Sequence, residues 1–147
     1  DLYDTMREIT GQPKIDNGGD DSFSLVPAFK GKPNTTRSTL ISHSISGHFS
    51  IRQGDWKLCL SAGSGGWSAP RENEAKNKGL PPIQLFNLKQ DKAEKNNLQA
   101  KNKTKVQELI ELLDAEVKNG RSTAGKKVPN DREVTYLPKG YISSNLK

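Results

Sequence analysis

The chain has 147 residues, a hydrophobic share of 31%, 13 glycines and a formal net charge of +6. This length allows one modest core, and the low apolar content requires much of the chain to form loops. One cysteine and the lack of a continuous apolar run argue against an internal disulfide framework, a cysteine-rich zinc site and a membrane span.

The charge is unevenly distributed. Residues 1–21 carry six acids against two bases, whereas residues 71–105 carry nine bases against four acids. A basic surface of this kind suits an anionic glycan, nucleic acid or a membrane, or it consists of solvated lysines on loops. Residues 87–105 contain no aromatic side chain, so the stacking platform typical of a single-strand binder is missing there.

The first predicted element is a helix over residues 1–10, where Leu2, Met6 and Ile9 recur at helical spacing. This helix needs a surface against which its apolar stripe can pack. The polar residues 12–38 that follow predict a loop with an isolated helical turn.

Strands are predicted at 39–45 and 48–53, where apolar and polar residues alternate, and again from Trp56 onward. Between them, Gly54 and Asp55 have the chemistry of a hairpin turn, because glycine tolerates a positive φ at the first turn position.

The strand that starts at Trp56 has two distinct faces. The positions of its apolar face are Trp56, Leu58 and Leu60, and those of the opposite face are Lys57, Cys59 and Ser61. A small cysteine in such an alternating pattern is typical of a buried side chain.

The connection over residues 62–82 is rich in Gly, Ser, Pro and charge and predicts a loop, and a strand is predicted at 83–88. Asp91 is placed to cap a brief helix over 92–98. Residues 121–147 are polar and lack periodicity, which predicts an extended or partly disordered tail.

A long amphipathic helix is predicted over residues 104–120. Its apolar stripe consists of Val106, Leu109, Ile110, Leu113 and Val117. Thr104 and Gln107 have the spacing of a capping box, and Gly120 is placed to end the helix. The elements together predict an α+β fold, with a small antiparallel sheet of three to four strands covered by the long C-terminal helix.

The chemistry-bearing residues define no convincing active site by themselves. His43 and His48 lack further ligands at zinc-site spacing, and a strand interior usually hides a thiol such as Cys59 from reaction. The Asp20-Asp21 pair offers hard oxygen ligands for calcium, but its polar, glycine-rich context favours a solvated turn.

Four segments, taken in chain order, carry a resemblance to a known protein family. They are DLYDTMREITG, GDDSFSLVPAFKGK, SHSISGHFSIRQGDWKLCL and QLFNLKQDKAEKNNL. Together they closely resemble the C-terminal part of formylglycine-dependent sulfatases of the arylsulfatase and N-acetylgalactosamine-6-sulfatase type. The resemblance covers about residues 1–120. Its most specific motifs are IRQGDWKL and the later LFNL, which is followed by D-x-A-E.

The resemblance implies a two-part parent enzyme that hydrolyses sulfate esters, of a sulfated glycan or an aryl sulfate. In this interpretation the catalytic domain ends with the helix of residues 1–11. The C-terminal subdomain of an alkaline-phosphatase-like sulfatase is formed by residues 12–120, and an extended tail is formed by residues 121–147. The implied formylglycine arises within a C/S-x-P/A-x-R motif, which the context of Cys59 does not match. Formylglycine and calcium are therefore expected in the catalytic domain, with no cofactor, metal or catalytic residue in this chain.

In such enzymes the C-terminal subdomain leans against the catalytic cleft. The resemblance thus makes His43, His48 and Trp67 candidate substrate-binding residues, with Trp67 stacking on a sugar ring. The alternative is that these histidines belong to the solvent face of the sheet. By the same resemblance, the parent is expected to be periplasmic or secreted, and to work without a membrane or nucleic-acid partner. A competing hypothesis is a stand-alone basic module that binds anionic glycan or nucleic acid.

Overall fold

The structure, a computed structural model, describes residues 1–16, 18–33, 37–139 and 141. The chain divides into two compact units. Unit 1 consists of residues 1–38 and 114–134, and unit 2 consists of residues 39–113 and 135–147. The predicted domain boundaries near residues 11 and 120 refer to a larger parent enzyme and stay a prediction.

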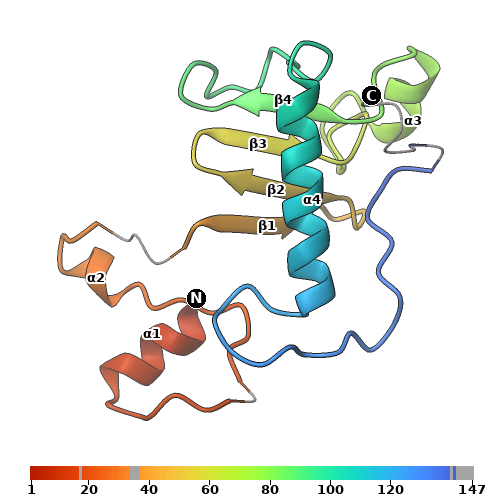
Figure 1. Ribbon diagram of the computed structural model, residues 1–147. Coiled ribbons are helices and arrows are strands. Elements are labelled where there is room, and N and C mark those ends of the chain that lie inside the picture. Colours follow the sequence, from red (N-terminus) through yellow and green to blue (C-terminus); the bar gives the residue numbers. More distant parts are fainter. Residues whose placement is uncertain (17, 34–36, 140, 142–147) are drawn as a thin grey trace. The chain divides into compact units, whose positions relative to one another are not determined.

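Unit 2 is built on a four-stranded antiparallel sheet with the order β1-β2-β3-β4 (Figure 1). The strands are β1 (Thr39–His43), β2 (Phe49–Gln53), β3 (Trp56–Cys59) and β4 (Gln84–Asn87). These are the four predicted strands, each shorter than the sequence pattern suggests.

The turn between β2 and β3 forms as predicted. Gln53 pairs with Trp56, which leaves Gly54 and Asp55 as a two-residue turn, and Gly54 has a φ of 56°. This positive φ is the conformation that glycine adopts without steric cost.

The core of unit 2 lies between the sheet and the part of helix α4 (Lys103–Asn119) that ends at Leu113, which crosses one face of the sheet in Figure 1. On the sheet, Ile51, Leu58 and Leu85 are cross-strand neighbours, and all three are fully buried. The buried residues of α4 are Val106, Leu109, Ile110 and Leu113. The apolar face of the sheet and the apolar face of α4 are thus both buried in one small unit. The predicted α+β fold is confirmed.

The two ends of α4 differ in how well the sequence located them. The helix begins at Lys103, so Thr104 already lies inside the first turn and the predicted capping box is wrong. The C-terminal end is as predicted. Gly120 has a φ of 69°, and its N–H donates to the carbonyl of Glu116. A left-handed residue at this position is a common helix terminator.

Two local predictions in unit 2 fail. The connection after β3 contains a short helix, α3 (Glu72–Asn77), that the loop-like composition concealed. The brief helix predicted after Asp91 does not form. Instead, the Asp91 carboxylate accepts the N–H groups of Lys95 and Asn96 at 2.8 and 2.7 Å, which stabilises a turn in place of a helix.

Unit 1 contains α1 (Leu2–Ile9) and the single turn α2 (Val26–Phe29), as the sequence predicts. The buried residues of α1 are polar. Asp4 and Thr5 are both buried. Hydrogen bonds offset the cost of burying these polar residues: the Asp4 N–H donates to Ser22 Oγ, and the Thr5 hydroxyl accepts the N–H of Leu25.

The apolar stripe of α1 is exposed. Its members are Leu2, Met6 and Ile9, whose exposed fractions are 71%, 61% and 61%. An amphipathic stripe of this kind is stable in water only when some other apolar surface covers it.

The first residues of the tail are fixed within unit 1. Arg121 is 5% exposed, and its guanidinium donates to Thr123 Oγ1 and lies 3.5 Å from the carboxylate of Asp20. Asp21 accepts the N–H of Ser122 at 2.8 Å. The Asp20-Asp21 pair lies in a turn, as predicted, with Asp21 exposed, and it also fixes the start of the tail as a structural clamp. Among the described residues, no helix is both long and apolar enough to cross a membrane.

Candidate functional site

The candidate substrate-binding residues all lie in unit 2: His43 at the end of β1, His48 in the connection between β1 and β2, and Trp67 in the loop after β3. His43 ends β1 and pairs with Phe49, so its side chain shares the sheet face of Ile51. The imidazole of His43 meets the Phe49 ring edge-on at 3.9 Å between centroids, and that ring in turn approaches Tyr136 at 6.1 Å. His43 is exposed within a small aromatic group.

His48 and Trp67 come from segments that touch. His48 closes the β1–β2 turn, where its N–H donates to Ser44 Oγ. This turn contacts the segment of residues 62–70, hereafter the Gly-Ser loop, because the Ser46 N–H donates to the carbonyl of Gly65. Trp67 lies on the Gly-Ser loop and is 81% exposed. The tertiary structure therefore brings the two segments together, as a shared binding surface requires.

Trp67 borders a depression of about 390 Å³, hereafter the aromatic hollow. Its lining residues are Ser46, Gly65, Gly66, Trp67, Arg71, Glu72, Asn73 and Glu74. The two carboxylates of the hollow are already engaged: Glu72 accepts the N–H groups of Ala62 and Gly63, and Glu74 accepts that of Arg71. The indole of Trp67 is thus the large apolar group that this hollow presents to solvent.

A larger depression of about 870 Å³ lies against β3 and β4, hereafter the sheet-face cavity. The strand residues that line it are Lys57, Cys59, Ser61, Gln84 and Phe86. These positions alternate with the buried Leu58 and Leu85, so the cavity lies on the face of the sheet opposite α4. The rest of its wall comes from the Gly-Ser loop, from Leu80 and Pro81, and from residues 92–100.

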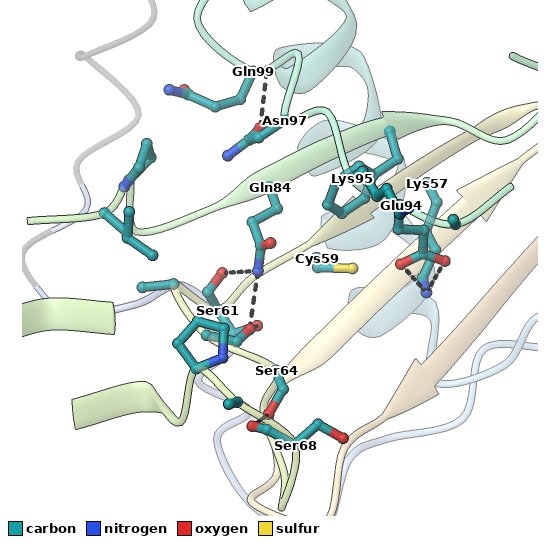
Figure 2. Close-up of a pocket in the computed structure, with 18 of the residues that line it drawn as sticks. Lys57, Cys59, Ser61, Ser64, Ser68, Gln84, Glu94, Lys95, Asn97 and Gln99 are labelled. Atoms are coloured by element: carbon teal, nitrogen blue, oxygen red, sulfur yellow. Dashed lines mark hydrogen bonds and ion pairs between the residues drawn. The ribbon is translucent and has the colours of Figure 1, made fainter. Parts of the chain in front are cut away.

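Figure 2 shows an ion pair on one side of this cavity and an amide bridge on the other. Lys57 Nζ lies 2.8 and 2.9 Å from the two carboxylate oxygens of Glu94. The Gln84 amide donates to the carbonyls of Ser61 and Gly63, which ties the start of the Gly-Ser loop to β4. The cavity wall is therefore held by polar contacts rather than by apolar packing alone.

Cys59 lies in the sheet-face cavity as a neutral thiol. Burial raises its pKa from 9.0 to about 11; the positive charge of Lys57 opposes this rise and the negative charge of Glu94 adds to it. Because a thiolate is the nucleophilic form, a thiol with this pKa is unreactive near neutral pH. The raised pKa of Cys59 argues against a nucleophilic role for it under those conditions.

The described residues contain no group of three or more His, Cys, Asp or Glu side chains that could hold a metal ion. The Asp20-Asp21 pair does not fit the calcium that sulfatases imply, because its carboxylates are engaged with Arg121 and Ser122. We therefore derive no metal-dependent step from this chain.

Sequence reasoning missed the sheet-face cavity. Its signal was present in the alternation of Lys57, Cys59 and Ser61 with the apolar face of β3. That pattern identifies a face turned away from the core. It does not show that Glu94 and the Gly-Ser loop fold over that face, since both are distant in sequence.

The sheet with its C-terminal helix, together with the four sequence segments, defines the class of this chain. It is an α+β unit of the kind found in sulfatases, and the comparisons with known proteins agree. The chain is 26% identical over 115 residues to an N-acetylgalactosamine-6-O-sulfatase of Bacteroides thetaiotaomicron. This alignment spans 78% of the chain but only 22% of that enzyme. No protein-family model matches the chain.

Solved structures give the same result. A protein designated 6S-sulf, from the metabolism of multiple glycosaminoglycans by Bacteroides thetaiotaomicron, matches with a TM-score of 0.61 and 26% identity. That match covers 78% of this chain and 24% of the solved one. A chain in complex with its substrate D-glucosamine-2-N,6-O-disulfate shares the fold, with a TM-score of 0.51, 21% identity, and coverage of 76% and 22%. The resemblance to a sulfatase C-terminal subdomain is confirmed.

Proposed function

We propose that this chain is the C-terminal subdomain of a sulfatase that hydrolyses sulfate esters of a sulfated glycan. The observation that carries the proposal is the agreement of sequence and fold with sulfatases over 78% of the chain. The names of these relatives, an N-acetylgalactosamine-6-O-sulfatase and a protein of glycosaminoglycan metabolism, favour a 6-sulfated amino sugar as the substrate.

In this proposal the groups that cleave the ester belong to a catalytic domain, and this chain supports that domain. The exposed stripe of α1 favours such a partner, because Leu2, Met6 and Ile9 need an apolar surface to cover them. The neutral Cys59 thiol and the engaged Asp20-Asp21 pair supply neither a nucleophile nor a metal site. The chain by itself is then inactive toward sulfate esters.

The second part of the proposal is that His43, His48 and Trp67 line the substrate cleft of the parent enzyme. Trp67 supports this role because its indole is 81% exposed, and a sugar ring stacks readily on such a surface. A histidine that is protonated beside it would donate a hydrogen bond to a sulfate or carboxylate oxygen. The secreted or periplasmic location expected from the resemblance is part of the same proposal.

The test compares two polypeptides: this 147-residue chain, and the longer parent protein that the proposal requires, with its catalytic domain. We expect the longer protein to release sulfate from N-acetylgalactosamine-6-sulfate and the short chain to release none. Sulfate release is followed by ion chromatography. The proposal is wrong if the longer protein hydrolyses no sulfated saccharide, or if the short chain turns over the substrate unaided.

The cleft role is tested separately in the longer protein with Trp67→Ala. We expect KM to rise about tenfold, because a lost stacking contact is worth roughly 1–2 kcal/mol, while the melting temperature stays unchanged. Ile45→Ala is the matched control, since Ile45 is also exposed, at 70%, on the neighbouring turn. Unchanged kinetics in Trp67→Ala would leave the subdomain a purely structural role.

A further inference from the structure

We propose that the sheet-face cavity is a second binding site, separate from the cleft, for a saccharide unit that carries a sulfate or carboxylate group. This inference goes beyond the proposed function, because it concerns binding by this chain alone and requires no turnover. Neither Trp67 nor either histidine lines this cavity.

The first argument is size and position. At about 870 Å³ the cavity is within the range of small-molecule sites, which is roughly 300–1,000 Å³. It lies on the face of β3 and β4 that α4 leaves uncovered. Its wall is preformed, because Gln84 fixes the Gly-Ser loop and Glu94 is held by Lys57. A ligand therefore need not order the wall before it binds.

The second argument is charge. The lining contains the three lysines Lys57, Lys92 and Lys95 and the single acid Glu94, which leaves a net charge of +2. The contact with Glu94 neutralises Lys57. Lys92 and Lys95 are exposed and form no ion pair with any part of the chain that the structure describes. Two exposed lysines among the lining residues favour an anionic ligand.

The third argument is the mixed character of the lining. Apolar carbon atoms are supplied by Pro70, Leu80 and Pro81, which suit the C–H face of a sugar ring. Ser68 and Gln99 add polar side chains that suit hydroxyl groups. The combination of ammonium groups, hydroxyl-binding groups and apolar carbon matches an anionic sugar better than a bare inorganic ion.

The lining also distinguishes between anionic ligands. Single-stranded nucleic acid requires an accessible aromatic face on which a base stacks. The aromatic residue of this cavity is Phe86, which is only 3% exposed and forms part of the floor. The cavity therefore lacks a stacking platform, and a saccharide is the occupant that its chemistry fits.

The experiment titrates the 147-residue chain with N-acetylgalactosamine-6-sulfate, with N-acetylgalactosamine and with sodium sulfate, at constant ionic strength. Backbone amide shifts in NMR spectra are the readout. We expect the sulfated sugar to shift amides of residues 57–61 and 92–100, and to bind about tenfold or more tightly than either other compound. Equal binding of sodium sulfate, or shifts confined to other residues, would overturn the proposal.

Substitutions of charged residues test which of them contribute to binding in the cavity. Lys92→Gln/Lys95→Gln should weaken binding about tenfold. Lys78→Gln is the matched control: Lys78 is exposed and lies outside the cavity lining. Trp67→Ala should have no effect. An unchanged affinity in the double variant, with its circular dichroism spectrum intact, would contradict the assignment.

A second readout uses the wild-type chain and does not depend on how a variant folds. Cys59 is the chain's single cysteine and lies in the cavity wall. At alkaline pH, where the Cys59 thiolate forms, saturating N-acetylgalactosamine-6-sulfate should slow its alkylation by iodoacetamide at least several-fold, and unsulfated N-acetylgalactosamine at the same concentration should not. An equal rate with and without the sulfated sugar contradicts the proposal. Because neither readout involves hydrolysis, failure of the proposed sulfatase function leaves this test intact.

Discussion

The sheet-face cavity and the aromatic hollow share the Gly-Ser loop but differ in chemistry. The cavity has three lysines and a buried phenylalanine, whereas the hollow presents an exposed tryptophan beside two engaged glutamates. One loop of nine residues thus contributes to two surfaces with different preferences. Its backbone is fixed from both sides, by Glu72 through Ala62 and Gly63 and by Gln84 through Ser61 and Gly63.

The difference shows how a glycine-rich segment becomes a defined structure. Gly and Ser side chains contribute little packing, so the loop is positioned by hydrogen bonds from outside it. Its few large side chains are then free to face solvent. If this explanation is right, disturbing the shared backbone should damage both surfaces, whereas disturbing one wall should damage only one.

The largest effect is expected for Gly63→Ala. A Cβ at this position would lie 2.6 Å from the Pro70 carbonyl oxygen and 2.9 Å from the Glu72 nitrogen, and backbone atoms cannot yield cheaply. We expect a loss of about 3 kcal/mol in the free energy of unfolding, measured by urea denaturation. Amide shifts should change on both the cavity and the hollow.

Gly66→Ala is the control for that substitution. It lies in the same loop, but its added Cβ would meet Ile45 at an ordinary contact distance of 3.4 Å. Its stability should change by less than about 0.5 kcal/mol. Equal losses in the two variants would show that the close approach at Gly63 is not what shapes the loop.

The next effect concerns only the cavity and depends on pH. The folded-state pKa of Cys59, about 11, exceeds its ordinary value of 9.0, so the unfolded chain releases the thiol proton first. The contribution of Cys59 to stability is therefore complete below pH 9 and is lost as pH rises toward 11. The expected loss is about 2 kcal/mol.

This contribution is isolated by comparing the wild type with Cys59→Ala in urea denaturation at pH 8, 9, 10 and 11. The variant should lose less stability over this range, because other alkaline titrations affect both proteins equally. Parallel pH profiles would mean that the thiol is not desolvated in the folded state.

The smallest effect of the three is expected for Glu72→Gln, which weakens the support of the shared backbone at Ala62 and Gly63. The carboxylate of Glu72 accepts two backbone N–H groups, at 3.2 and 2.9 Å, and an amide is a weaker acceptor. We expect a loss of about 1–2 kcal/mol in thermal or urea unfolding, with amide shifts on both the cavity and the hollow.

Glu108→Gln is the matched comparison. The side chain of Glu108 is 52% exposed and pairs with Lys105 on the surface of α4, where such pairs contribute less than about 1 kcal/mol. If Glu72→Gln leaves the amide shifts of either surface unchanged, then Glu72 does not fix the backbone that the two surfaces share.

Much of the sheet was predictable because its information is local. Alternation located β1, β2, β3 and β4, and Gly54 with Asp55 predicted the hairpin turn that forms. The same local reasoning failed at α3 and at the turn after Asp91. In both places side-chain carboxylates bond to nearby backbone N–H groups, and such contacts decide between helix and turn without leaving a periodic pattern.

The candidate site was predictable only in part. Trp67 could be selected as an aromatic residue within a glycine-rich loop, and the structure leaves it exposed. The pairing of Lys57 with Glu94 could not be selected, because 37 residues separate them in sequence. The same holds for the clamp between Asp20 and Arg121, which joins residues about 100 positions apart.

The amino-acid sequence by itself determined the periodic elements, the hairpin turn and the resemblance to sulfatases, because these depend on neighbouring residues or on short motifs in order. Only the tertiary structure decided which polar side chains meet. It placed the Gly-Ser loop between two different surfaces, left the stripe of α1 exposed and buried Arg121. The physical reason is that contacts between distant residues depend on how chain segments pack, and no local pattern records that packing.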